Sequence, residues 1–155
     1  MEQELKLGLV DTDALCRLLA VLPAPTAIIE QTNHYFVDDR GTLASTRTML
    51  RVRESRRVDS DDPVQILLTL KRRLQATDGY FIADEQECAL DTVAWEAVRA
   101  GRRDLSTLGA APLDELGLSG SLRCHGVMRN TRHVIACEGF TLEVDRTELP
   151  GGRVD

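Results

Sequence analysis

Hydrophobic and polar residues alternate along much of this chain, and the alternation begins in residues 1–9. The charged residues stand two positions apart, at Glu2, Glu4 and Lys6. Leucines occupy odd-numbered positions, at Leu5, Leu7 and Leu9. Successive side chains of a β-strand point to opposite sides. The pattern therefore predicts a strand with one charged face and one apolar face.

Later segments repeat this alternation or are rich in β-branched and aromatic residues, which favour strands. The strands predicted in this way are residues 26–37, 49–55, 64–73, 79–89, 121–131, 132–138 and 140–149. Four of them place charged or polar residues together on one face: Arg51 with Arg53, Lys71 with Arg73, Glu85 with Glu87, and Thr141 with Glu143 and Asp145. The opposite face of residues 49–55 carries Leu50 and Val52. The charged face of the first strand thus recurs on other strands.

Two helices interrupt the strands. Asp11 is a suitable N-cap for a helix that extends to about Leu22, with an apolar stripe formed by Ala14, Leu15, Leu18, Leu19 and Leu22. Asp91 predicts a second helix that ends near Gly101, and a short helical turn is expected after Pro112. Seven or eight strands with two helices predict an α+β fold that is mainly antiparallel. We expect a tunnel-like barrel, closed or incompletely closed, with helices packed outside it.

Length and charge narrow the function classes. The chain has 155 residues, which favours a single domain, and a formal net charge of −6, which argues against a general binder of nucleic acids or anionic membranes. No apolar run approaches the roughly 20 residues of a membrane helix, and acidic residues stand where a signal peptide would carry basic ones. We therefore expect a cytoplasmic protein without nucleic-acid or membrane partners, in an oligomeric state that the sequence leaves open.

The charged faces have two interpretations. The first is an ordinary solvated sheet face. The second is an interior lined by charges, which are costly unless they bind something. Carboxylates would then hold Mg²⁺ or Mn²⁺, and the candidates are Glu2, Glu4, Glu85, Glu87 and Asp145. Basic side chains would hold a polyanion such as a phosphate chain, and the candidates are Lys6, Arg51, Arg53, Lys71, Arg73 and Arg132. A metal beside a basic cradle is typical of phosphoryl transfer. The alternation alone leaves both interpretations open.

The order of the charged motifs resembles that of a known family. The motifs are Glu2-Gln3-Glu4-Leu5-Lys6, Gln31-Thr32-Asn33-His34-Tyr35-Phe36, Met49-Leu50-Arg51-Val52-Arg53, Leu68-Thr69-Leu70-Lys71, Glu85-Gln86-Glu87, Gly126-Val127-Met128-Arg129-Asn130-Thr131-Arg132 and Leu142-Glu143-Val144-Asp145-Arg146-Thr147. In this order they resemble the CYTH family, the triphosphate tunnel metalloenzymes. The resemblance extends over nearly the whole chain, and the only two lysines, Lys6 and Lys71, fall on lysine positions of the family.

The resemblance implies an eight-stranded antiparallel tunnel that holds a divalent metal on acidic residues and a triphosphate on basic ones. Glu2 and Glu4 resemble the metal-side acids, Glu85 and Glu87 the fifth-strand acids, and Asp145 a late aspartate of the family. Resemblance to the phosphate ligands is found at Lys6, Arg51, Arg53, Lys71 and Arg132, and Arg73 shares a face with Lys71. Glu4 and Lys71 are the expected catalytic residues.

The implied reaction is metal-assisted attack of water on a terminal phosphoryl group. The substrate would be inorganic triphosphate, thiamine triphosphate or a nucleoside triphosphate. An adenylyl cyclase is the least favoured variant, because no residue pattern predicts recognition of a base or a ribose hydroxyl.

One departure from the family lies near residue 155. Members of the family usually continue past the turn that matches Leu149–Asp155 into another strand with an E-x-E motif. We therefore expect residues 1–155 to form one CYTH-like domain that is incomplete at its C-terminal side. Two alternatives to a working enzyme follow: a catalytically weak or inactive module that binds triphosphate or polyphosphate, and an unstable fragment.

Overall fold

The computed structural model describes residues 2–77, 80–117, 120–149 and 154, and within its strands and helices the side chains of residues 2–5, 73–77, 80–81 and 115 are not described. The elements of the described residues follow in this order: β1 (Glu2–Leu5), α1 (Thr12–Val21), β2 (Ala27–Asp38), α2 (Thr42–Ser45), β3 (Thr48–Arg57), β4 (Gln65–Thr77), β5 (Tyr80–Ala89), α3 (Thr92–Arg99), the 3₁₀ helix η1 (Leu105–Leu108), α4 (Ala111–Glu115), β6 (Leu122–Cys137) and β7 (Phe140–Glu148).

The described strands form one sheet in the order β1-β5-β4-β3-β2-β6-β7. The pairs β1–β5, β4–β5 and β6–β7 are antiparallel. The prediction of an α+β, mainly antiparallel fold is therefore confirmed. None of the helices in the described ranges is long and apolar enough to cross a membrane.

The chain divides into two compact units. Unit 1 comprises Met1–Lys6, His34–Arg53 and Gln65–Gly126, and unit 2 comprises Leu7–Asn33, Glu54–Val64 and Val127–Asp155. Three strands, β2, β3 and β6, contribute residues to both units.

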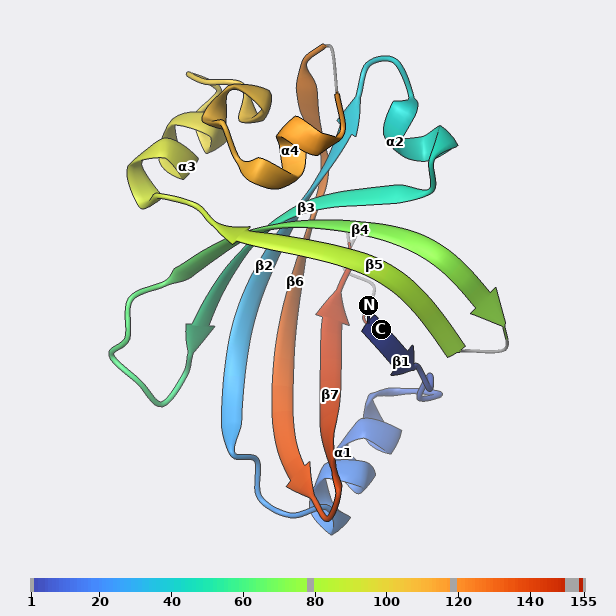
Figure 1. The fold of residues 1–155 in the computed structure, drawn as a ribbon. Coiled ribbons are helices and arrows are strands. Elements are labelled where there is room, and N and C mark those ends of the chain that lie inside the picture. The colour runs from blue at the N-terminus through green and yellow to red at the C-terminus, as the bar shows by residue number, and fades with distance from the viewer. Residues whose placement is uncertain (1, 78–79, 118–119, 150–153, 155) are drawn as a thin grey trace. The chain divides into compact units, whose positions relative to one another are not determined.

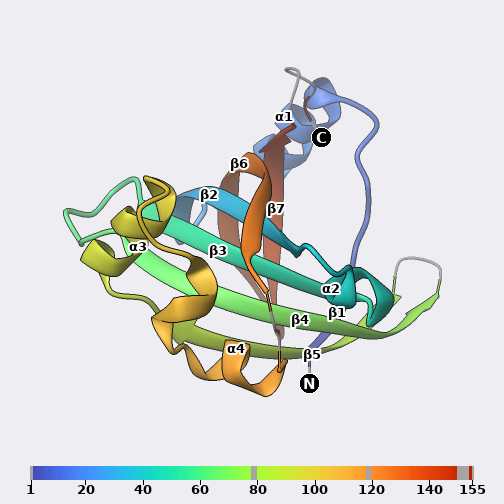
Figure 2. The same ribbon diagram turned by 90° about the horizontal axis from the view of Figure 1, so that it is seen from above.

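The core of unit 1 lies between a sheet face and a layer of helices. In Figures 1 and 2, α3 and α4 lie on one side of β4 and β5. The apolar residues of β3 and β4 pack against this layer: Leu50, Val52, Ile66, Leu68 and Leu70. From the helical layer come Trp95, Leu105 and Leu113. The alternation predicted for residues 49–55 is thus confirmed, because Leu50 and Val52 are buried under helices while Arg51 and Arg53 occupy the other face.

Unit 2 is built around the β6–β7 hairpin and α1. The helix begins as predicted, since the Ala14 N–H donates to Asp11 Oδ1 at 2.7 Å. Its apolar stripe packs on one face of the hairpin, with Leu15, Ile135 and Val144 buried and Leu18, Leu19 and Leu22 partly buried around them. This packing places α1 beside β6 and β7 (Figures 1 and 2).

The first predicted strand was too long. β1 ends at Leu5, which pairs with Tyr80, the first residue of β5, so β5 offers no partner to Lys6. The predicted apolar face beyond this point is wrong, because Leu7 is 82% exposed and Leu9 is 46% exposed.

The two strands predicted at residues 121–131 and 132–138 are one strand, β6. Its pairing with β7 runs without a shift through Thr131–Arg146 and Arg132–Asp145, so the chain does not turn between them. The short helix α2 was not predicted. The carboxylate of Asp38 caps it by accepting the N–H groups of Thr42 and Leu43 at 2.8 and 2.9 Å.

Asp104 joins η1 to the start of β6 within unit 1. Its carboxylate accepts Ser106 Oγ at 2.7 Å and the N–H groups of Ser106 and Leu122 at 2.9 and 3.3 Å. Burial raises the pKa of this carboxyl, but the hydrogen bonds from Ser106 and Leu122 lower it by more, so that the pKa lies below its usual value of 3.8. The charged form is therefore the one that stabilises the fold.

We expect Asp104→Ala to lower the free energy of unfolding by about 1 kcal/mol at pH 7, the usual cost of losing a capping carboxylate. Because the folded pKa is depressed, this contribution is fully present above about pH 4 and is lost as the pH falls through the folded pKa. Urea unfolding at pH 7 and pH 3 checks this. The difference between wild type and variant should shrink at pH 3, whereas a constant difference, or an equal effect of Ala at the exposed Asp114, would contradict the assignment.

Candidate functional site

The face of unit 1 opposite the helices carries charged groups in matched rows. In the β4–β5 register, Lys71 is opposite Glu85 and Thr69 is opposite Glu87. Lys71 Nζ lies 3.3 Å from Glu85 Oε2, and both side chains are about one-fifth exposed, at 21% and 19%. Such half-desolvated ion pairs interact more strongly than exposed ones, because water screens them less. The predicted phosphate ligand Lys71 and the predicted metal ligand Glu85 are therefore direct neighbours.

Arg51 extends the same rows onto β3 through a threonine. Arg51 Nη2 donates to Thr69 Oγ1 at 3.3 Å, and Thr69 Oγ1 donates to Glu87 Oε1 at 2.9 Å. The hydroxyl of Thr69, whose residue is completely buried, thereby links a predicted phosphate ligand to a predicted metal ligand. Arg51 Nε is buried and has no hydrogen-bond partner among the described residues. One buried guanidinium donor is thus left for an oxygen of a water molecule or a ligand to satisfy.

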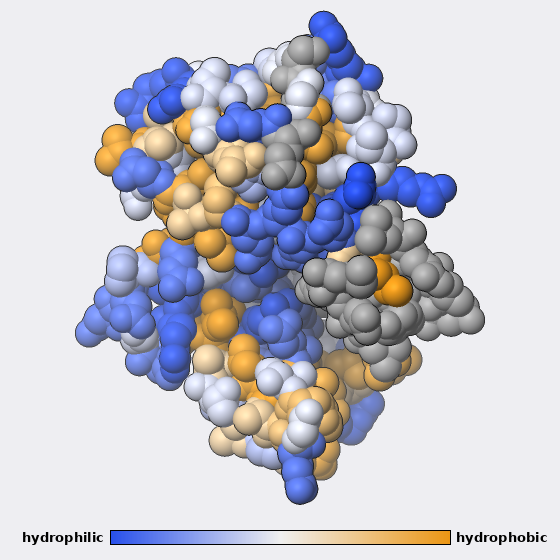
Figure 3. All heavy atoms as spheres, viewed as in Figure 1, coloured by the Kyte–Doolittle hydropathy of each residue, from blue (hydrophilic) through white to orange (hydrophobic). Residues whose placement is uncertain are grey.

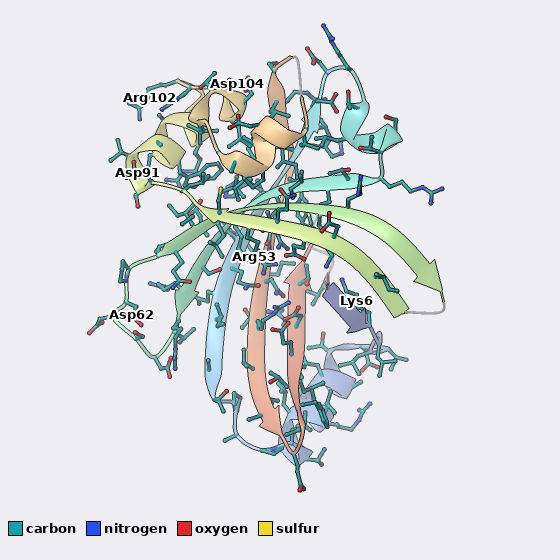
Figure 4. The ribbon with its side chains drawn as sticks, in the orientation of Figure 1. Lys6, Arg53, Asp62, Asp91, Arg102 and Asp104 are labelled. Atoms are coloured by element: carbon teal, nitrogen blue, oxygen red, sulfur yellow. The ribbon has the colours of Figure 1, made fainter. Side chains whose placement is uncertain are left out.

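Arg53 lies two residues further along the same face of β3, and Figure 4 shows it on the side of the sheet away from α3 and α4. The face seen in Figure 3 is hydrophilic over much of its centre, with some hydrophobic residues in between. Lys6 follows β1 as an exposed residue and does not belong to the strand on which it was predicted.

Three predicted ligands have side chains outside the described residues: Glu2, Glu4 and Arg73. Their backbones are described. Glu2 pairs with Ala83 and Glu4 with Phe81 in the β1–β5 register, and Arg73 also pairs with Ala83, from β4. The backbone register therefore brings β1 alongside the strand that carries Glu85 and Glu87.

Unit 2 contains a second charged cluster on the β6–β7 hairpin. Arg132 is opposite Asp145, and its Nε and Nη2 donate to Asp145 Oδ1 and Oδ2 at 2.8 and 2.7 Å. Arg132 Nη1 also forms an ion pair with Glu143. The structure thus brings together the predicted phosphate ligand Arg132 and the predicted metal ligand Asp145, and it adds Glu143 to them.

Buried amides continue this face of the hairpin. Asn130 Nδ2 donates to Gln31 Oε1 at 3.0 Å, and Thr147 Oγ1 donates to Asn130 Oδ1 at 3.2 Å. Gln31 and Asn130 are among the few buried polar residues. They were not selected as site residues from the sequence, although both lie in the motifs that resemble the family. The sequence feature that could have identified them is a polar residue in the interior of a predicted strand. Asn130 also lies two positions before Arg132.

Unit 2 also has a pocket of about 460 Å³ lined by β2, β3, β6 and β7. Its basic and acidic side chains include two ion pairs, Arg56–Glu30 at 2.7 Å and Arg146–Glu148 at 3.3 Å. In the hairpin register, Glu148 and Arg146 alternate with Thr147 and Asp145, so they lie on the opposite face from Arg132. The two ion pairs of the pocket are therefore on the other face from Arg132, although Gln31 and Asn130 also line the pocket.

The described carboxylates are oxygen ligands of the type that Mg²⁺ and Mn²⁺ take, so the donor chemistry fits a divalent metal. Each of them is also engaged by a neighbour: Glu85 by Lys71, Glu87 by Thr69, and Asp145 by Arg132. No group of three or more His, Cys, Asp or Glu that could hold a metal is present among the described residues. A metal would need the carboxylates of β1 or an exchange of these ion pairs.

Comparison with known proteins places this arrangement in a family context. The family model described as the CYTH domain matches residues 1–154. A search of curated proteins found no match.

Solved structures share the fold over almost the whole chain. One is HpAC1 from Hippeastrum, provisionally assigned as an adenylyl cyclase and described as having a dominant triphosphatase activity; it is 30% identical, has a TM-score of 0.84, and the match covers 99% of this chain and 76% of that one. A protein from Bacillus halodurans, provisionally assigned as an adenylate cyclase, is 22% identical with a TM-score of 0.69, covering 99% and 74%. The PH1819 protein of Pyrococcus horikoshii OT3 is 15% identical with a TM-score of 0.60, covering 98% and 72%.

Proposed function

Because this chain belongs to the CYTH domain family, we propose that it is a triphosphatase that hydrolyses the terminal phosphoanhydride bond of a triphosphate. The observation that carries this proposal is the row of basic and acidic groups in unit 1, in which Arg51, Thr69 and Glu87 are linked by hydrogen bonds and Lys71 pairs with Glu85. Arg51 Nε is buried and has no hydrogen-bond partner among the described residues. Buried donors are normally paired, so this one favours a binding site over a sheet face that is simply solvated.

In this proposal the basic residues bind the phosphate oxygens: Lys6, Arg51, Arg53, Lys71, Arg73 and Arg132. Their charges offset the negative charge that the triphosphate carries and that the leaving phosphate gains. Lys71 and Glu4 act next to the reacting phosphoryl group. Thr69 fixes the orientation of the Arg51 guanidinium, since its hydroxyl proton is directed to Glu87 and its lone pair to Arg51.

Hydrolysis is proposed to depend on Mg²⁺ or Mn²⁺ held by Glu2, Glu4, Glu85, Glu87 and Asp145. A divalent ion in this place would withdraw charge from the phosphate oxygens and orient the attacking water. The carboxylates of Glu85 and Asp145 are kept in their positions by Lys71 and Arg132.

Inorganic triphosphate, thiamine triphosphate and nucleoside triphosphates are the proposed substrate class, with polyphosphate as a related ligand. Triphosphatase activity is favoured over cyclase activity because the 30% identical HpAC1 is described with a dominant triphosphatase activity. We further propose that residues 1–155 act as a single domain in the cytoplasm on small molecules, without nucleic-acid or membrane partners.

A second candidate is a module that binds triphosphate without hydrolysing it. The ion pairs favour it, since the described carboxylates are engaged by protein groups. Calorimetry with tripolyphosphate, with Mg²⁺ and with EDTA, combined with phosphate release, separates the two. The triphosphatase requires metal-dependent release; binding that is independent of metal and gives no release would identify the module, and the absence of binding would remove both.

A further inference from the structure

A row of uncharged polar side chains crosses three neighbouring strands of the sheet, β2, β6 and β7 (Figure 1). Thr147 of β7 donates its hydroxyl to Asn130 Oδ1 at 3.2 Å, and Asn130 Nδ2 donates to Gln31 Oε1 of β2 at 3.0 Å. All three residues belong to unit 2. Both hydrogen bonds run in the same direction, from β7 towards β2, so the row ends at the amide nitrogen of Gln31.

The amide nitrogen of Gln31 is the open end of this row. Gln31 is only 6% exposed, yet its Nε2 makes no hydrogen bond among the described residues. In the described part of unit 2, the side-chain polar atom that is both completely shielded and unpaired is His133 Nδ1, so Gln31 Nε2 stays within reach of solvent or a ligand. Buried polar groups are normally paired, and an unpaired donor in the interior of a strand indicates a binding role.

The row lies on the face of the hairpin that carries Arg132. Asn130 and Arg132 are two positions apart on β6, so their side chains point to the same side, and their partners on β7 are Thr147 and Asp145. Helix α1 packs on the opposite face of the hairpin. Two residues along a strand span about 7 Å. The uncharged row is therefore the direct neighbour of the proposed phosphate ligand Arg132.

The two rows suit different parts of a ligand. The guanidinium of Arg132 matches the charge of a phosphate, whereas the row that ends at Gln31 carries no charge to offset another phosphate. A neutral amide donor suits a neutral oxygen, and a sugar joined to a phosphate presents such oxygens next to it. We propose that Gln31 is a specificity-determining residue that donates from Nε2 to a sugar oxygen of a nucleoside triphosphate, whose sugar-bearing phosphate lies at Arg132.

This inference rests on the proposed function, in which Arg132 binds the triphosphate, and it narrows the substrate class. Inorganic tripolyphosphate has no sugar and makes no such contact with the amide. A site that hydrogen-bonds a particular substrate group discriminates against an analogue that lacks the group. Gln31 therefore favours nucleoside triphosphates, and its removal must change the ratio between the two substrates and not only the overall rate.

The experiment compares kcat/KM for ATP with kcat/KM for tripolyphosphate, with Mg²⁺, in the whole chain and in Gln31→Met. Methionine is unbranched like glutamine but has no amide. The ratio of ATP to tripolyphosphate should fall about tenfold, the scale of one hydrogen bond. A general defect in folding lowers both values and leaves their ratio unchanged, so the ratio separates recognition from stability.

Two pairs of variants give matched controls. Gln65→Met makes the same replacement at an exposed position of β4 and should leave the ratio unchanged. Thr147→Val removes the hydroxyl that starts the row and should lower the ratio, by less than Gln31→Met. Thr131→Val makes the same change on the other face of β6, where Thr131 is opposite Arg146, and should leave the ratio unchanged.

An equal loss for both substrates in Gln31→Met, an unchanged ratio, or a wild type that hydrolyses tripolyphosphate and not ATP would each overturn the inference while the proposed function stands. If the wild type is folded by circular dichroism and hydrolyses neither substrate, the proposed function fails and the role of Gln31 fails with it.

Discussion

Replacement of Lys71 by alanine is expected to lower kcat/KM for tripolyphosphate about 100-fold or more, the usual effect of removing a charge that stabilises a transition state. Lys71 lies on the charged face of β4, 3.3 Å from Glu85, and its side chain is only 21% exposed, so water cannot replace its charge well. Initial rates of phosphate release over a range of tripolyphosphate concentrations, with Mg²⁺ present, measure the effect.

The matched control for Lys71 is Arg72→Ala. Arg72 is the next residue of β4, is exposed, and points to the other face of the strand. Arg72→Ala removes the same positive charge, but from the other face of the strand. Its kcat/KM for tripolyphosphate should therefore stay close to that of wild type. Unchanged kinetics in a folded Lys71→Ala protein, or an equal loss in Arg72→Ala, would remove Lys71 from the proposed site.

Replacement of Trp95 by alanine is expected to lower the free energy of unfolding by about 3–5 kcal/mol, as for other large buried aromatic residues. Trp95 is 2% exposed and lies in the core of unit 1. Its ring meets His34 edge-on at a centroid distance of 4.9 Å and Phe36 at 6.3 Å. The melting temperature followed by circular dichroism should fall by roughly 10 °C.

Two variants control this prediction. Trp95→Phe keeps an aromatic ring and should cost less than Trp95→Ala. Val93→Ala lies on the same helix, but Val93 is 73% exposed, so its effect should stay within about 0.5 kcal/mol. If Trp95→Ala and Val93→Ala shift the melting temperature equally, the helical layer does not stabilise the fold as described.

The alternation along the strands predicted the faces of β3 and β4 correctly because each apolar face is covered by helices within the same unit. Leu50 and Leu68 are buried, and Arg51 and Lys71 lie on the other side. Alternation could not predict the end of β1, since that depends on where β5 begins. It also could not predict that β6 continues through Thr131, which follows from pairing with β7.

From the sequence, the candidate site was predicted as a set of basic residues and a set of acidic residues. Which basic residue lies beside which acidic residue depends on the register of the sheet. Only the β4–β5 register shows that Lys71 meets Glu85. Thr69 and Asn130 were not selected because a threonine or an asparagine in a strand has no charge to mark it, although both are buried. The roles assigned to Glu2, Glu4 and Arg73 stay predictions, because their side chains lie outside the described residues.

Phosphate release from tripolyphosphate, measured with Mg²⁺, with Mn²⁺ and with EDTA, tests the central claim most directly, with Glu4→Gln as the comparison protein. A triphosphatase of the proposed kind releases phosphate only with a divalent metal and loses most of that release in Glu4→Gln. No release from a folded wild-type protein, or release that persists in EDTA and in Glu4→Gln, would contradict the proposal.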